Sequence, residues 1–191
     1  MFIRTYEDSD EESWVRCRVL SFLNTAYYDN VLQKKEMYNH PAIELVAVID
    51  GQVVGLIDIE YENEPGTVCT AHDERGGMIW HIAVHPDYQR NGIGERLLEA
   101  AVKKARDNYL SYLEAWTRDD AWVQNWYRKM EFQEMSSYYH LYFEGKETEH
   151  LRHNNPAVNP VSVFAHYTGD DIESFKTLQR KHKCVCYVRN I

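Results

Sequence analysis

The pattern of apolar and polar positions changes period once very clearly, between Met78 and Ala105. Residues 78–84 form a short segment rich in β-branched and aromatic side chains, which predicts a strand. Proline at position 86 ends that strand, because it donates no backbone hydrogen bond and restricts the residue before it. From Ile93 onward, apolar side chains recur at steps of three and four, as on the buried face of a helix.

Before this segment, the pattern predicts a strand over residues 2–6, a helix after it, a weaker helix over 30–38 and a hairpin. The hairpin joins strands at 44–49 and 52–60 through Asp50-Gly51, one of the strongest short-range turn signals. For the first helix we expect Asp8 or Ser9 as the cap. Its buried stripe is expected to hold Val15, Val19, Phe22 and Leu23.

After residue 61 the pattern predicts a long loop to residue 76 and, beyond the central segment, a strand at 109–116, a helix at about 119–129 and a strand at 132–143. The inner side of that helix should carry Val123, Trp126, Tyr127 and Met130. Residues 144–191 predict a loop bracketed by Pro156 and Pro160, a short helix over 170–180 and a last strand at 184–188. In the short helix, Ile172, Phe175 and Leu178 should point inward.

The composition narrows the class of protein. A chain of 191 residues suits one domain, or one domain with an appendage, and its formal net charge of −9 argues against a nucleic-acid binder. An acidic surface either attracts a cationic amine or simply keeps the protein soluble. With no apolar run near 18 residues and no signal-peptide pattern, we expect no membrane span and a cytoplasmic location.

The four cysteines are spaced too irregularly for a disulfide framework, which favours a reducing compartment. Residues His182, Cys184 and Cys186 would share one face of a strand. Two thiolates and one imidazole so close together make a poor tetrahedral cage. We therefore expect buried apolar cysteines and no metal site.

The junction from Gln89 to Gly94 predicts a phosphate-binding site. The first N–H groups of a helix have no partner within it and carry the positive end of its dipole. Glycines at 92 and 94 leave those groups open, and Arg90 adds a charge. A Walker loop is excluded because Glu95 follows the last glycine, and a dinucleotide fingerprint lacks its third glycine at Leu97.

A strand, a proline break, [Gln/Arg]-x-x-Gly-x-Gly and an amphipathic helix, in this order, resemble the coenzyme A loop of the GNAT superfamily of acyl-CoA-dependent N-acetyltransferases. The segment from Asp120 to Phe132 is similar to a second GNAT motif, Asn-x-x-Ala-x-x-aromatic-Tyr-x-x-x-Gly-Phe. Asp120, Val123 and Glu131 replace its Asn, Ala and Gly. The resemblance implies an α/β fold with a mixed, mostly antiparallel central sheet flanked by helices.

The resemblance also implies where acetyl-CoA, the co-substrate, would bind. Backbone groups at the end of the fourth strand would hold the pantetheine arm, and N–H groups of the loop would hold the diphosphate. The cofactor-binding residues are then Ile82, Ala83, Val84, Gln89, Arg90, Asn91, Gly92, Ile93, Gly94 and Glu95.

For catalysis, the resemblance points to Tyr127 as the general acid, since a phenol with a pKa of about 10 is protonated at neutral pH. Glu114 is the candidate base, on the expected fifth strand. Other candidates are His81, Glu60, Glu62 and an ordered water. Strand alternation puts Trp80 at the usual base position and His81 on the opposite face, unless a local bulge reverses them.

The expected function is therefore acetyl transfer from acetyl-CoA to a primary amine by direct attack on the thioester. A non-catalytic acyl-CoA sensor or regulatory module is the alternative. The acceptor stays open among a small amine, a polyamine or aminoglycoside, and a protein N-terminus or lysine. We expect a core at 1–143 and an extension at 144–191 that covers the acceptor site or forms an oligomer contact, which leaves a homodimer open.

Overall fold

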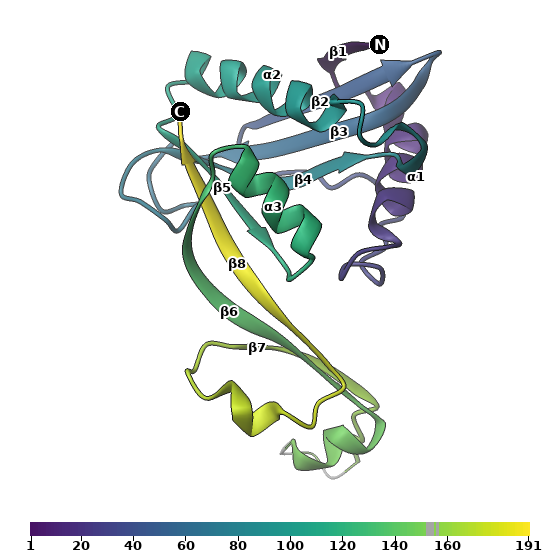
Figure 1. Ribbon diagram of the computed structural model, residues 1–191, viewed down its shortest axis with the longest axis vertical. Helices are drawn as coiled ribbons and strands as arrows, with labels where there is room; N and C mark the ends of the chain where they lie inside the picture. The colour runs from purple at the N-terminus through teal and green to yellow at the C-terminus, as the bar shows by residue number, and fades with distance from the viewer. Residues whose placement is uncertain (152–154, 156) are drawn as a thin grey trace.

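A computed structural model describes residues 1–151, 155 and 157–191 as a sheet with helices on both faces (Figure 1). The strands are β1 (Phe2–Thr5), β2 (Ala42–Ile49), β3 (Gln52–Tyr61), β4 (Gly76–Val84), β5 (Tyr112–Thr117), β6 (Gln133–Glu144), β7 (Ser162–Tyr167) and β8 (Arg180–Asn190). The α-helices are α1 (Glu11–Phe22), α2 (Ile93–Asp107) and α3 (Ala121–Lys129).

The eight strands lie in the order β1-β2-β3-β4-β5-β8-β6-β7. Every neighbouring pair is antiparallel except β4 and β5, which are parallel. The expected mixed, mostly antiparallel sheet is therefore confirmed. The last strand, β8, lies inside the sheet between β5 and β6 and not at an edge.

The hairpin between β2 and β3 is formed as predicted. Asp50 and Gly51 have φ angles of 49° and 77°, both in the left-handed region that a tight two-residue hairpin turn requires. The pair Ile49 and Gln52 closes the turn.

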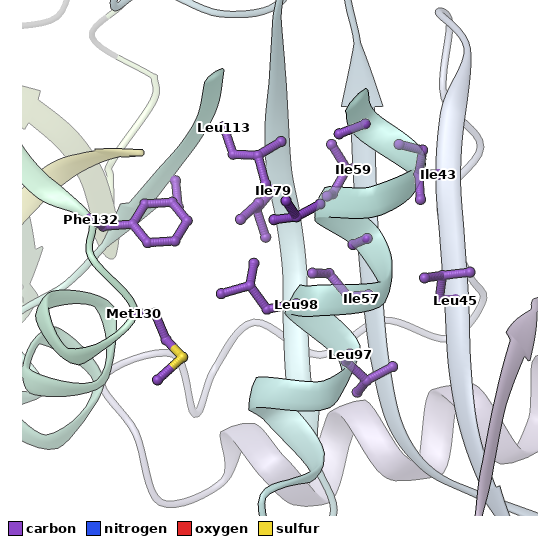
Figure 2. Close-up of a cluster of buried hydrophobic side chains, with 14 of the residues drawn as sticks. Ile43, Leu45, Ile57, Ile59, Ile79, Leu97, Leu98, Leu113, Met130 and Phe132 are labelled. Carbon is purple, nitrogen blue, oxygen red and sulfur yellow. The ribbon is translucent and has the colours of Figure 1, made fainter. Parts of the chain in front are cut away.

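Alternation along the strands builds one core on each face of the sheet. On one face, Leu97 and Leu98 of α2 belong to a cluster with Ile57 and Ile59 of β3, and Figure 2 shows these side chains around α2. On the other face, Trp14 of α1 packs in a second cluster that contains Val46 and Val48 of β2 and Val53 and Leu56 of β3. The sheet thus separates α2 and α3 from α1 (Figure 1).

The predicted first helix exists, but its buried face and its cap are not those expected. Its buried residues are Trp14, Cys17, Arg18 and Ser21, whereas Val15, Val19 and Phe22 are half-buried and Leu23 is 50% exposed. A 3-10 turn over Asp8–Asp10 precedes it, Glu7 and Asp10 form a capping box there, and Asp10 is the N-cap of α1. Hydrophobic periodicity could not find this face because part of it is polar.

The prediction of a weaker helix over 30–38 is wrong. This segment contains no helical turn. Its groups bind the sheet instead of one another. The Lys35 ammonium pairs with Asp58 of β3 over 3.2 Å, and the Tyr38 hydroxyl donates to the same carboxylate over 3.0 Å. The N–H groups of Asn39 and His40 donate to Glu60.

The region after residue 144 also departs from the prediction. Strand β7 was not predicted, β8 is longer than 184–188, and the helix over 170–180 is only a 3-10 turn, Ile172–Phe175. The inward side chains were predicted correctly, since Leu178 is buried in a cluster that Ile172 and Phe175 join. Pro156 lies outside the described residues. Strands β6 and β8 run together beyond the helices to this cluster (Figure 1).

Among the described residues, no helix combines the length and the apolar character needed to cross a membrane.

The long loop between β3 and β4 is held by a buried carboxylate at its start. Glu62 is fully buried and accepts hydrogen bonds from the N–H groups of Val68, Cys69 and Gly76 over 2.8–3.0 Å. Burial alone would raise the pKa of Glu62, but the backbone donors outweigh it and the net pKa is lowered. The loop therefore depends on an ionised carboxylate.

We predict that Glu62→Gln destabilises the protein at pH 7 by about 1–3 kcal/mol, because an amide cannot accept from all three donors. A lowered folded-state pKa contributes stability above the ordinary glutamate value of about 4.3, and this contribution is lost as the pH falls through the folded value. The difference in unfolding free energy between wild type and variant should therefore shrink below about pH 4. Urea titrations from pH 3 to pH 7 measure it, and a constant difference would contradict the role.

Candidate active site

The site lies where β4 and β5 stop pairing. Their parallel register runs from Gly76 opposite Tyr112 to Ile79 opposite Ala115 and goes no further, and the two strands then diverge (Figure 1). Beyond this point β4 stays with β3 and β5 stays with β8. A cavity of about 940 Å³ lies between them, near the upper limit of about 1,000 Å³ for small-molecule sites.

The N-terminus of α2 opens into one end of this cavity. The first backbone hydrogen bond of the helix runs from Arg96 N to Gly92 O, so the N–H groups of residues 93–95 precede it. Gly92 and Arg90 have φ angles of 74° and 62°, which turn the loop sharply before the helix. The exposed Arg90 brings positive charge to this end, whereas Lys129 is paired with Glu95 over 3.4 Å.

The residues predicted to bind the cofactor line this cavity, except Asn91. The Asn91 amide instead donates to the carbonyl oxygens of Tyr88 and Gln89. The Gln89 amide donates to Val84 O over 3.0 Å and so connects the loop to the end of β4. Apart from Asn91, the structure brings together the loop and the strand end as the sequence indicated.

Gly94 keeps the passage between β4 and α3 open. A Cβ atom there would lie 3.6 Å from the Trp126 ring and 3.7 Å from the Val84 side chain. This is ordinary contact distance, so alanine fits, but a longer side chain would have to enter the passage. The geometry is that of a groove that an elongated ligand can pass through beside the helix end.

Tyr127 lines the cavity from α3. Its ring stacks on Tyr187 at 5.3 Å and meets Trp126 and Phe132 edge-on, and the residue is 4% exposed. Burial raises the pKa of Tyr127 well above the ordinary phenol value. The phenol therefore stays protonated at neutral pH.

Glu114, the candidate base from the sequence, lies outside the cavity lining. It is fully buried, and its oxygens accept from the N–H groups of Thr70 and Ala71, the Thr70 hydroxyl and the Trp116 indole over 2.7–2.9 Å. Four donors from the protein itself therefore hold this carboxylate in place. Its role is to hold the loop after β3 against β5.

The remaining candidate bases are also engaged elsewhere. Glu60 and Glu62 do not line the cavity. Glu60 accepts from the Trp80 indole over 2.8 Å and from two backbone N–H groups, and Glu62 holds the loop described above. Both are therefore structural carboxylates.

A bulge in β4 reverses the simple alternation, which was the exception that the sequence left open. Ile79 pairs with Ile59 and His81 pairs with Asp58, so Trp80 is the extra residue. His81 consequently faces α1, where its ring meets Trp14 edge-on at 5.5 Å.

Both ring nitrogens of His81 are occupied. Arg18 Nε donates to Nδ1 over 3.3 Å, and Nε2 lies 2.7 Å from Glu36 Oε2. Because an arginine can only donate, Nδ1 accepts and Nε2 carries the proton. His81 therefore has no free lone pair for a base, and both Arg18 and Glu36 line the cavity beside it. Sequence reasoning missed these two residues, since Arg18 lies on a helix face expected to be apolar and Glu36 in a segment expected to be helical.

The far end of the cavity is closed by β6 and β8. Tyr138, His140 and Cys184 line it, whereas none of the described residues from 144 to 183 does. The insertion before β8 therefore does not cover the cavity in the described part of the chain. Asp120 also lines it, and its carboxylate accepts from Ala26 N over 2.9 and 3.1 Å, which ties the start of α3 to the segment after α1.

Comparison with known proteins defines the class. Residues 4–132 match the model of the acetyltransferase (GNAT) family. This match covers more than half of the chain, and the chain belongs to the GNAT family of acetyltransferases.

The chain is 27% identical over 142 residues to the acetyltransferase SG1711 of Sodalis glossinidius, which covers 72% of this chain and 90% of that protein. Its fold is similar to that of ribosomal-protein-alanine N-acetyltransferase from Brucella melitensis, with a TM-score of 0.59, 16% identity and full coverage of both chains. A GNAT acetyltransferase from Elizabethkingia anophelis, solved with acetyl-CoA bound, gives a TM-score of 0.55 at 14% identity and covers 100% of this chain and 97% of that one.

We predict that Glu114→Gln lowers the free energy of unfolding by about 1–3 kcal/mol, because the amide turns a donor toward groups that themselves donate. Glu99→Gln, at an exposed position on α2, is the matched control and should change stability little. Denaturant unfolding measures both. A Glu114 variant as stable as the control would argue against the structural role.

Proposed function

We propose that this protein binds acetyl-CoA in the cavity between β4 and β5 and transfers the acetyl group to a primary amine of a small molecule or peptide. In this arrangement the N–H groups at the start of α2 hold the diphosphate, and the free edge of β4 at Ile82–Val84 holds the amides of the pantetheine arm. Tyr127 protonates the departing sulfur.

One observation carries the proposal: an unpaired strand edge, an open helix N-terminus and a neutral phenol share one cavity. An unpaired edge presents backbone N–H and C=O groups that need partners, and an amide-rich chain supplies them. The helix N-terminus favours an anion. A phosphate, an amide chain and a thioester each find a matching group in this lining.

The chemistry assigned to Tyr127 follows from the reaction's balance. The thioester supplies the acetyl group; the amine nitrogen forms the C–N bond as the C–S bond breaks, and the sulfur leaves with the electron pair. Tyr127 gives that sulfur its proton. A primary ammonium ion loses two protons when it becomes the amide. In the overall reaction one proton ends on the sulfur, by way of Tyr127, and the other is released to water.

The alternative of a non-catalytic acyl-CoA module has less support. Binding alone needs neither a phenol at the end of the groove nor a cavity that continues past it to Tyr138 and His140. The substitutions in the second motif do not favour that alternative either, since Asp120 makes its own hydrogen bond.

We predict that acetyl-CoA at about 100 times its Kd stabilises the wild type by about 2.7 kcal/mol, a rise in Tm of about 5–10 °C. Gly94→Glu should abolish this shift, because the side chain enters the groove and its charge repels the diphosphate. Gly94→Ala, whose Cβ fits at 3.6 Å, should keep most of it. Differential scanning fluorimetry tests the series, and an undiminished shift in the glutamate variant would contradict the proposed binding mode.

We predict that Tyr127→Phe lowers kcat about 100-fold, the lower end of what a general acid contributes, while the acetyl-CoA shift in Tm stays intact. The ring contacts are kept, so little stability should be lost. Thiol release measured with an accepted amine gives kcat. If kcat is unchanged, Tyr127 is a packing residue and a different donor must protonate the sulfur.

A further inference from the structure

We infer that the acceptor binds as an ammonium ion to the free oxygen of Glu36, on an apolar or aromatic body with no carboxylate beside the amino group. The inference rests on the proposed function and names the substrate class of the same site. It comes from how the far end of the cavity holds Glu36 and from the charges and rings around it.

The backbone around Glu36 is fixed by two anchors in the sheet. Its neighbour Lys35 is 5% exposed in its side chain and forms ion pairs with Asp58 and Glu44. Two residues further on, the Tyr38 hydroxyl donates to the same Asp58 over 3.0 Å. A segment without helix or strand is thereby held at both sides of Glu36, which places this side chain on the cavity wall.

One Glu36 oxygen is oriented by a relay from α1. The Arg18 guanidinium is buried and donates through Nε to His81 Nδ1, so that His81 Nε2 donates to Glu36 Oε2 over 2.7 Å. This hydrogen bond, which outweighs partial burial, lowers the pKa of Glu36. The carboxylate is thus ionised, and its Oε1 makes no hydrogen bond within the described residues while the side chain is 45% exposed.

The surroundings favour a cation on an apolar body. Four aromatic residues line the same cavity as Glu36: Trp80, which is 48% exposed, Trp116, Tyr138 and Tyr27. Aromatic faces attract cations and pack against apolar groups. An ammonium at Glu36 would therefore have its charge paired and its carbon chain against these rings.

The cation beside Glu36 in the described lining is buried, because Arg18 is only 1% exposed. Its Nε, Nη1 and Nη2 donate to His81 and to two oxygens of Asn30. Burial, with Arg118 nearby, lowers the pKa of His140 to about 4, so that this ring is neutral. A carboxylate next to the amino group would meet the Glu36 charge, and the buried Arg18 is already engaged with His81 and Asn30, which disfavours α-amino acids.

The test compares amines with the amino acids from which they differ by one carboxylate: phenethylamine with phenylalanine, tyramine with tyrosine, and tryptamine with tryptophan. Thiol release is followed at saturating acetyl-CoA. We expect at least one of the amines to be acetylated, with kcat/KM about tenfold or more above that of its amino acid. Equal turnover of amine and amino acid, or turnover of none of the amines, overturns the inference.

Glu36→Gln should raise KM for the accepted amine about 10- to 100-fold, the range expected for a lost charged hydrogen bond, with KM for acetyl-CoA unchanged. Glu173→Gln, exposed in the extension, removes the same charge elsewhere and is the control. An unchanged amine KM in Glu36→Gln overturns the inference. If acetyl-CoA does not raise the Tm of the wild type, the proposed function itself fails. This measurement therefore distinguishes failure of the proposed function from failure of the inference about Glu36.

His81 is a positioning residue for Glu36. His81→Leu should raise the amine KM, whereas His81→Gln, whose amide accepts from Arg18 and donates to Glu36, should restore much of the loss. The acetyl-CoA shift in Tm should persist in both variants. A pure packing role for His81 predicts no rescue by glutamine, and that result would remove the relay.

Discussion

The divergence of β4 from β5 is the constraint on which the rest of the site depends. Backbone groups in the middle of a sheet are normally paired, and leaving them unpaired costs free energy unless a partner arrives. Here the strands separate after Ile79 and Ala115 because each follows its other neighbour, β3 on one side and β8 on the other. The β4 bulge at Trp80 adds local twist at the same point. The unpaired edge, the helix end and the residues proposed to bind the acceptor all line the space that results.

Features of the site within one stretch of chain could be predicted from the sequence. The strand, loop and α2 follow from hydrophobic period, proline and glycine, and the Asp50-Gly51 turn follows from its φ requirements. The residues that hold the acceptor end could not be found in this way. The hydrogen bond from Arg18 to His81 joins residues 63 positions apart, and the bonds from Thr70 and Ala71 to Glu114 join residues more than 40 positions apart. Periodicity describes one element and gives no information about such polar partners.

Two of the three departures from the second GNAT motif, Glu131 and Asp120, have visible structural consequences. Glu131 stands where the motif has glycine and adopts a φ of 66°, a region that costs a residue with a Cβ about 1–2 kcal/mol. Asp120 stands where the motif has asparagine and binds a backbone N–H of the segment after α1. A carboxylate accepts hydrogen bonds but does not donate them. Asp120, at the start of α3, can therefore bind the N–H group of Ala26, but it cannot bind a carbonyl oxygen there as asparagine could. Both substitutions leave Tyr127 facing the cavity.

The placement of β8 between β5 and β6 has a consequence for how the protein reaches its folded state. Strand β5 cannot complete its ladder until β8, far along the chain, is available, and β6 depends on the same strand. Pairings at such sequence separation form late, because much loop entropy must be lost first. Until then the sheet has two open edges beside the future acceptor pocket, and such edges promote association between chains. Catalytic competence and protection from aggregation should therefore be acquired in a single late step.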